Sequence, residues 1–274
     1  MSNVISSDIQ DQSDKCIEGK FLKLDVTCKK SFSEAIKEYK INKIIHLANI
    51  SPADSEKDIE LTTKVNIEGV HTALELAKEY KISIFIPSSA ELNSTSKSTE
   101  ECLTDPQHLY GITKLYMEKL GNYYYDKYSV DFRCLRYPIV LSKWDDYGAF
   151  TYDMLFSAMN SESYNISFES GKQLPFIHIE DCVRGTCQFI DSHNSLLKRR
   201  VYNMAGISFS SGKYFKELKK VIKFNATNEL DHSRINYLKL FPEEINDNSA
   251  RSDWGWSPQI QNVKKIIEHQ LMNI

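Results

Sequence analysis

The 274-residue sequence lacks the spacings of cysteine and histidine that small metal and redox sites require. Its six cysteines form no CxxC pair, and its seven histidines show no HxH or HExxH spacing. A zinc knuckle, a dithiol redox pair and a metalloprotease motif are therefore not indicated, and we expect no metal site. Scattered thiols are typical of a protein in a reducing compartment. The cysteines are Cys16, Cys28, Cys102, Cys134, Cys182 and Cys187.

Long apolar runs and a strong net charge are missing as well. No segment is apolar for long enough to cross a bilayer, and we expect no signal peptide or other targeting segment. The formal net charge of -3 gives no reason to expect nucleic acid or a membrane surface as a partner. Hydrophobic residues make up 41% and charged residues 26%, which is typical of a globular protein with its own core.

Strands and helices are expected to alternate through the first half of the chain. The runs KIIHLAN (43–49) and ISIFIP (82–87) are apolar throughout, as in strands that are buried on both faces. This alternation predicts parallel βαβ units, and hence an α/β fold with a Rossmann-like, doubly wound parallel sheet. The expected strands are 3–7, 20–24, 43–49, 82–87 and 131–138, and the expected helices are 30–39, 57–80 and 108–128.

The second half of the chain has a less regular pattern. No internal repeat or linker stands out, so we expect one domain over 1–274. A small C-terminal substrate lobe is expected mainly from about 144–172 and 205–274. Helices are expected near 148–160, 210–223 and 259–272, strands near 164–168 and 200–203, and a strand followed by a helix at 175–182.

The motif YGITK, at the start of the helix expected over 108–128, is the strongest chemical signal. Its i, i+4 spacing places Tyr110 and Lys114 on one helical face. A tyrosine hydroxyl ordinarily has a pKa of ~10 and is a poor base at neutral pH, but a neighbouring ammonium favours the phenolate. Isolated pairs at this spacing are common on solvated helices, so the motif needs support from its context.

Two serines supply that context. Ser88 and Ser89 directly follow the strand expected over 82–87. A hydroxyl at the carboxyl end of a parallel strand faces the crevice in which such sheets bind ligands. Ser89 could therefore hydrogen-bond a substrate oxygen while Tyr110 takes its proton. The alternative is that the serines only begin a loop.

Four longer segments make the sequence similar to a known enzyme family. Together with the serines and the YxxxK motif, they resemble the L-threonine 3-dehydrogenases, a branch of the extended short-chain dehydrogenase/reductases in the NAD-dependent epimerase/dehydratase family. YxxxK alone is specific only to the superfamily, whereas FRCLRYP and ARSDWGW are much more specific. The segments are VNIEGVHTALELA (65–77), YYYDKYSVDFRCLRYP (123–138), QLPFIHIEDCVRGT (173–186) and DNSARSDWGWSP (247–258).

The resemblance implies a cofactor, a substrate and an assembly. The cofactor is NAD, and the reaction is oxidation of the C3 hydroxyl of L-threonine to 2-amino-3-oxobutanoate. The resemblance also implies a homodimer and a mitochondrial location, with the cytoplasm as the alternative.

The resemblance also implies roles for individual residues. Tyr110 is the general base, Lys114 tunes it, and Ser89 positions the substrate hydroxyl with Ser88 beside it. The substrate-contacting residues are Ser51, Ser89, Tyr110 and Asp181. The cofactor-binding residues are Asp8, Asp25, Val26, Leu47, Ala48, Asn66, Lys114, Tyr137 and Pro138.

Several of these residues also have a purely structural interpretation. Asp8 fits an ordinary turn, and Asp181 fits the N-cap of a helix. Trp254 and Trp256 are expected to be packing anchors rather than ligand contacts.

The sequence departs from the family at its beginning. The family's GxxGxxG motif should stand about 20 residues before the carboxylate that binds the ribose. Only seven residues precede Asp8, so we expect an N-terminally truncated chain without the first βα unit. The strands that begin near Asn3 and Lys43 would then have unpaired inner edges.

Three further departures follow, of which the last two weaken the transfer of threonine specificity. AELNSTSKS (90–98) replaces a motif that contains glycine and an aromatic residue, and KWDDYGAFTY (143–152) replaces a loop rich in glycine and threonine. Pro52 stands where a serine is expected to contact the substrate, with Ser51 adjacent. Two alternatives therefore stay open: a nucleotide-sugar epimerase or dehydratase, against which FRCLRYP argues, and a non-catalytic relic or gene fragment.

Overall fold

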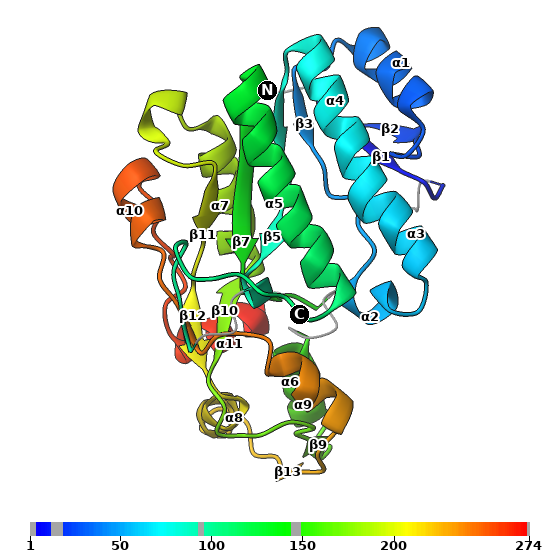
Figure 1. Cartoon of the computed structure of the whole chain (residues 1–274). Coiled ribbons are helices and arrows are strands. Elements are labelled where there is room, and N and C mark those ends of the chain that lie inside the picture. The colour runs from blue at the N-terminus through cyan, green and yellow to red at the C-terminus, as the bar shows by residue number, and fades with distance from the viewer. Residues whose placement is uncertain (1–3, 12–18, 93–95, 144–148, 273–274) are drawn as a thin grey trace. The chain divides into compact units, whose positions relative to one another are not determined.

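A computed structural model describes residues 4–11, 19–92, 96–143 and 149–272, and its elements are labelled in Figure 1. Its contacts divide the chain into two compact units. The first unit comprises residues 1–87 and 107–134, and the second comprises 88–106 and 135–274. The expected single domain with its small lobe stays a prediction.

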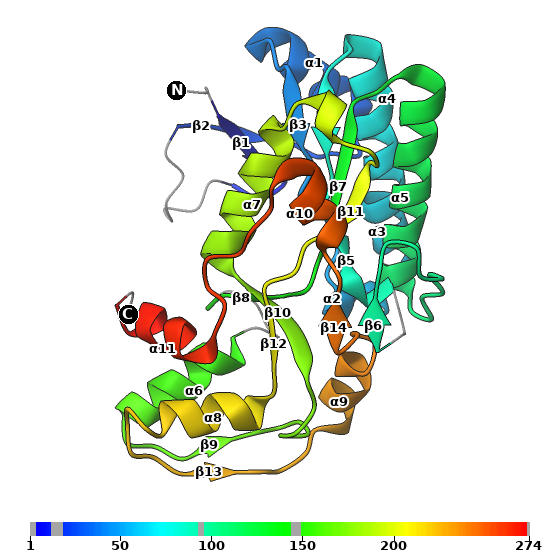
Figure 2. The ribbon, with the colours of Figure 1, turned by 90° about the vertical axis from the view of Figure 1, so that its left-hand side faces the viewer.

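The first unit contains the parallel sheet that the alternation predicted. β3 pairs with β4, and β4 pairs with the first residues of β7, both in parallel. Helices α4 and α5 lie side by side along one face of these strands (Figure 2). The strands are β3 (Lys43–Ile45), β4 (Ser83–Phe85) and β7 (Phe132–Tyr137). The helices are α1 (Lys29–Tyr39), α2 (Pro52–Ser55), α3 (Ile59–Thr63), η1 (Lys64–Gly69), α4 (Val70–Tyr80) and α5 (Leu109–Tyr128).

The helix expected over 57–80 is interrupted by a π-helical segment. α3 continues into η1, a π-helix, which continues into α4. Such wide turns are rare and often occur at functional sites. Asn66, a predicted cofactor residue, lies in this segment.

Local chemistry determines where α5 begins and how closely it packs. The ring of His108 accepts a hydrogen bond at Nδ1 from the backbone N–H of Gly111 at 3.2 Å, which caps the helix. Ser129 ends the helix with a left-handed φ of 57°. A side chain at Gly121 would collide with the ring of Phe132 on β7, so glycine permits close contact between helix and strand.

β1 (Ile5–Asp8) and β2 (Lys20–Lys23) form a separate parallel pair. Among the described residues, neither strand pairs with β3, which is the last strand of its own sheet. Both β1 and β3 therefore have an edge without a backbone partner in the described chain. This arrangement agrees with the expected gap between the strands that begin near Asn3 and Lys43.

The expected burial of KIIHLAN on both faces is wrong. Ile44 and His46 are buried, whereas Ile45 is 51% and Leu47 is 64% exposed. The helices cover the face of β3 that carries Ile44, whereas the alternate side chains Ile45 and Leu47 are exposed. ISIFIP agrees better with its prediction, since Ile84, Phe85 and Ile86 are buried.

The second unit has its own sheet and helices. β10 pairs in parallel with β8 and antiparallel with β12, and the end of β7 pairs with β5. The strands are β5 (Ser88–Ser89), β8 (Ile139–Leu141), β10 (Leu174–His178), β11 (Val201–Asn203) and β12 (Ile207–Phe209). The larger helices are α6 (Phe150–Met159), α7 (Ile179–Asp191), α8 (Ser211–Leu218) and α11 (Val263–Met272).

Several short elements complete the second unit. β6 pairs with β14 and β9 pairs with β13, both in parallel. The short elements are η2 (Ala90–Leu92), β6 (Lys97–Ser98), β9 (Tyr164–Asn165), η3 (Asn194–Leu196), β13 (Ala226–Thr227), α9 (His232–Leu238), β14 (Glu244–Ile245) and α10 (Asn248–Trp254).

The core of the second unit is rich in aromatic rings. Phe176 and Phe209 lie 4.4 Å apart between ring centres. Trp254 and Trp256 are buried, and Trp256 Nε1 donates to Asp247 Oδ2 at 3.0 Å. The prediction that both tryptophans are packing anchors is confirmed. None of the helices in the described part of the chain is long and apolar enough to cross a membrane.

Candidate active site

Tyr110 and Lys114 share one face at the start of α5, as their spacing predicted. The Lys114 ammonium lies 5.2 Å from the centre of the Tyr110 ring. Lys114 is buried, and its Nζ donates a hydrogen bond of 3.0 Å to the carbonyl oxygen of Pro87, after β4. The positive charge is thereby fixed beside the phenol, where it favours the phenolate.

A pocket in the first unit opens beside Lys114. Strand ends and helices both contribute to it, and the α5 side presents Lys114. The carboxyl ends of parallel strands are where open α/β sheets bind their ligands. The lining residues are Ala48, Asn49, Asn66, Val70, Ile86, Thr113, Lys114 and Met117.

Asn66 connects the loop after β3 to helix α5. Its side-chain oxygen accepts from the Ile50 backbone N–H at 2.7 Å. Its amide group donates to the Ile50 carbonyl oxygen at 3.2 Å and to Thr113 Oγ1 at 3.3 Å. Because Thr113 precedes Lys114, the buried amide orients the helix that carries the lysine.

His46 is a feature that the sequence interpretation missed. Burial, and after it the charge of Lys114, lowers its pKa to about 4, so the ring is neutral at pH 7. Within the described residues, its Nε2 has no hydrogen-bond partner. A histidine inside the apolar run KIIHLAN was the available signal.

The predicted adenosine-binding residues do not line this pocket. Asp8 is exposed at the end of β1, and its Oδ1 accepts from the Gln10 backbone N–H at 2.9 Å. Asp25 accepts from the backbone N–H and the hydroxyl of Thr27, which hold its pKa below the ordinary value. Val26 lies against Gly69, with 3.1 Å between its Cγ2 and a Cβ placed there.

Two further predicted residues belong to the segment after β3. Leu47 is exposed and adjoins Ala48, which lines the pocket. Ser51 donates from Oγ to Asp54 Oδ2 at 2.9 Å, so its hydroxyl hydrogen-bonds within the first turn of α2.

The remaining predicted residues belong to the second unit. β5 places Ser88 opposite Arg136 and Ser89 opposite Tyr137, and both serines are buried. The Tyr137 hydroxyl hydrogen-bonds Thr186 Oγ1. Pro138 follows in the chain and is also buried.

The interpretation of Asp181 as a helix N-cap is wrong. His178 occupies the N-cap position of α7, and Asp181 lies inside the first turn. The Asp181 carboxylate accepts from the backbone N–H groups of Gln259 and Ile260 at 2.9 Å, and from Arg184 at 2.6 Å. It therefore ties α7 to the segment before α11, a role that sequence spacing alone does not indicate.

These features define an α/β protein of the Rossmann-like type with the tyrosine–lysine pair of an oxidoreductase. A family model described as the NAD dependent epimerase/dehydratase family matches residues 3–205. The chain belongs to this family.

Known relatives of this chain include several L-threonine 3-dehydrogenases. It is 30% identical to the mitochondrial L-threonine 3-dehydrogenase of Sus scrofa over 93% of this chain and 71% of the relative. The crystal structure of L-threonine dehydrogenase from Clostridium difficile matches with a TM-score of 0.93 and 27% identity, over 98% of this chain and 88% of the other. A monomeric L-threonine 3-dehydrogenase from a metagenome matches with a TM-score of 0.90 and 29% identity, over 99% and 90%.

Proposed function

We propose that this chain oxidises the C3 hydroxyl of L-threonine to 2-amino-3-oxobutanoate. NAD, when bound, supplies the acceptor for the hydride from C3. The observation that carries the proposal is the buried Lys114 ammonium, 5.2 Å from the centre of the Tyr110 ring and beside a pocket at the strand ends. The names of the relatives support threonine as the substrate.

The proton of the substrate hydroxyl goes to Tyr110 in this proposal. Lys114 stabilises the phenolate that accepts the proton, and the Pro87 carbonyl keeps the ammonium in place. Ser88 and Ser89 follow Pro87 directly in the chain. We assign to Ser89 a hydrogen bond to the reacting oxygen, with Ser88 as its neighbour. We also propose that Ser51 and Asp181 contact the substrate.

We assign part of a dinucleotide to the first unit. The pocket offers the Asn66 amide and the Lys114 ammonium as polar groups, with Leu47 and Ala48 at the adjoining strand end. We further assign Asp8, Asp25 and Val26 to the adenosine portion, and Tyr137 and Pro138 to the nicotinamide. The sequence contains no glycine-rich turn for the pyrophosphate, so a weak affinity is expected.

The proposed assembly is a homodimer that uses α5. Ile112, Tyr116 and Tyr123 are exposed on this helix at spacings that place them on one face. Exposed apolar side chains gathered on one helical face favour a partner surface. The relative from a metagenome is a monomer, so monomeric L-threonine 3-dehydrogenases also occur. We propose a mitochondrial location because the pig relative is mitochondrial.

The test compares the substrates of two kinds of enzyme that share this fold. Purified protein is incubated with NAD and either L-threonine or a UDP-sugar, and NADH and the sugar products are measured. Threonine-dependent NADH supports the proposal, whereas conversion of the UDP-sugar alone supports an epimerase. If a folded protein that binds NAD carries out neither reaction, the result supports a non-catalytic relic.

A further inference from the structure

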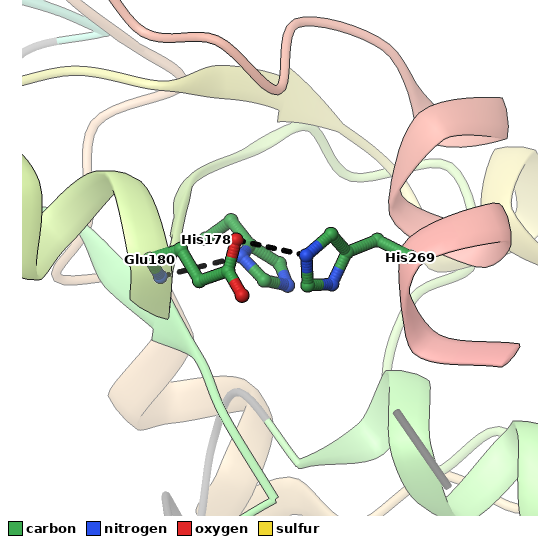
Figure 3. A group of neighbouring side chains, drawn as sticks. All are labelled: His178, Glu180 and His269. Carbon is green, nitrogen blue, oxygen red and sulfur yellow. Dashed lines mark hydrogen bonds and ion pairs between the residues drawn. The ribbon is translucent and has the colours of Figure 1, made fainter. Parts of the chain in front are cut away.

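A histidine–glutamate–histidine group lies in the second unit, and none of its three members is assigned a role in the proposed reaction (Figure 3). His178 is the last residue of β10, Glu180 lies in the first turn of α7, and His269 lies in the last turn of α11. One nitrogen or oxygen from each side chain lies within 4.8 Å of the others. The three side chains therefore converge from distant parts of the sequence.

The contacts within the group are close. His269 Nε2 and Glu180 Oε2 are 2.8 Å apart. The rings of His178 and His269 are 4.5 Å apart between centres and meet at an angle of 67°. Figure 3 shows the Glu180 carboxylate and both rings directed toward a common point.

His178 is a buried polar group without a complete set of partners. It is 2% exposed, and its Nε2 has no hydrogen-bond partner among the described residues. A buried unsatisfied nitrogen of this kind is rare and indicates a missing ligand.

We propose that His178, Glu180 and His269 bind one zinc ion, with water as the fourth ligand. Imidazole nitrogen and carboxylate oxygen are ordinary zinc ligands, and three of them with a water form a four-coordinate site. Zinc bonds of about 2.0–2.2 Å place neighbouring ligand atoms a little over 3 Å apart. Small side-chain rotations that separate the 2.8 Å pair slightly and bring the more distant ligand atoms closer would therefore form the site. Glu180, whose side chain is 62% exposed, gives the ion a route from solvent.

Binding through His178 Nε2 requires the ring proton to move to Nδ1. In the ion-free protein, Nδ1 accepts from the Glu180 backbone N–H at 3.3 Å, which is long for a hydrogen bond. This weak cap is lost when the ion binds. Zinc binding in turn replaces the direct contact between Glu180 Oε2 and His269 Nε2.

The site would fasten the C-terminal helix to the β10–α7 junction. α11 is already held on its buried side, where Gln270 Nε2 donates to Thr151 Oγ1 at 2.8 Å and Tyr214 donates to Gln270 Oε1 at 2.7 Å. His269 adds a second attachment next to Gln270. Sequence spacing did not indicate the site because His269 comes from the far end of the chain.

Zinc chloride titrated into the full chain, after removal of metal with EDTA, tests the proposal. The ligand variants are Glu180→Gln and His269→Gln, both at partly accessible positions. His232→Gln, at an exposed histidine on α9, is the matched control. Circular dichroism in EDTA verifies that each variant is folded.

We expect one zinc ion per chain with a micromolar dissociation constant. Each ligand variant should weaken binding by about tenfold or more, and the control variant should bind as the unchanged chain does. Zinc should raise the melting temperature of the unchanged chain and of the control only. Cobalt substituted for zinc should give the strong visible absorption of a four-coordinate site.

Three results would overturn the proposal. The first is no zinc binding by the folded chain at about 100 μM metal, well above the expected dissociation constant. The second is equal loss of affinity in His232→Gln and the ligand variants, which would indicate nonspecific binding by surface histidines. The third is a weak, six-coordinate cobalt spectrum. None of these readouts depends on threonine oxidation.

Discussion

Lys114 combines a permanent charge with a buried position next to the phenol of Tyr110. An ammonium in such a place is stable only with compensating contacts, which the Pro87 carbonyl and the face of the Tyr110 ring supply. In the proposed reaction, the same charge stabilises the phenolate of Tyr110, which accepts the substrate proton. A single lysine thus links the packing of α5 to the proposed chemistry.

Replacing Tyr110 with phenylalanine should remove the base and leave the fold intact. Only the hydroxyl is lost. We expect the rate of threonine-dependent NADH formation to fall by ~10²-fold or more, the usual contribution of a general base. Tyr116→Phe, at an exposed tyrosine of the same helix, is the control and should keep its activity. Equal rates in the two variants would remove Tyr110 from the mechanism.

His46 should make stability depend on pH. Its pKa is lowered from 6.5 to about 4 by burial and by Lys114, so the folded chain keeps it neutral while the unfolded chain protonates it. The unfolded state then binds more protons between these values, and the free energy of unfolding should fall as the pH decreases from 6.5 to about 4. Burial lowers the pKa of His178 and acts in the same direction.

The variant His46→Asn tests this assignment. Urea unfolding across that pH range should show a smaller pH dependence than in the unchanged chain, with a residual part from His178. His232→Asn, at an exposed position, should keep the full dependence. Identical slopes in both variants would mean that His46 does not titrate with the lowered pKa.

Residues differed in how well their places could be predicted. The i, i+4 spacing was enough for Tyr110 and Lys114, because a helix fixes which residues share a face. For Asp181 the alternative interpretation as a cap was wrong, because its partners Gln259 and Ile260 are distant in sequence. The role of His46 depends on burial, which no local pattern specifies.

At the scale of elements, the long helices and most strands could be predicted, whereas several short elements of the second half could not. α1, α5 and β10 lie where their periodicity placed them. β11 was expected near 200–203, but β8 and β12, which are equally short, were missed because three residues are too few to show a period of two. α9 was missed for a similar reason, since its seven residues span only about two turns.

The exposed face of α5 leads to a prediction about assembly. Ile112 and Tyr123 lie on this face, and a dimer would bury both. Light scattering at micromolar concentration should report a dimer for the unchanged chain. The double variant Ile112→Glu, Tyr123→Glu should be monomeric, because each substitution places a charge in the contact.

A variant with the same change in net charge on another helix is the control. Lys30→Glu, at an exposed position on α1, also lowers the net charge by two, as the two substitutions to glutamate on α5 do, and should remain dimeric. A monomer for the unchanged chain, or a dimer for the α5 double variant, would contradict this assembly.

At the scale of the whole molecule, the affinity for NAD is expected to be weak. Residues are proposed for the adenosine and the nicotinamide, but the given sequence has no glycine-rich turn of backbone N–H groups for the pyrophosphate. The open edges of β1 and β3 also leave the sheet interrupted in its described part. Calorimetric titration should give a dissociation constant well above the micromolar range.

A fusion protein separates the effect of the missing glycine-rich turn on NAD affinity from the effect of the interrupted sheet. A relative's opening strand, turn and helix placed ahead of Met1 should tighten NAD binding by at least about tenfold, since they add the helix N-terminus that anions favour. The same fusion with the turn glycines replaced by valine should restore the sheet without restoring the affinity. Micromolar NAD binding by the unfused chain would show that the turn is not needed.

The most direct test of the account is threonine-dependent reduction of NAD by the fusion protein. We predict NADH formation that requires L-threonine, saturates with it and is lost in Tyr110→Phe. A folded fusion that binds NAD with micromolar affinity and yet forms no NADH from threonine would contradict the account.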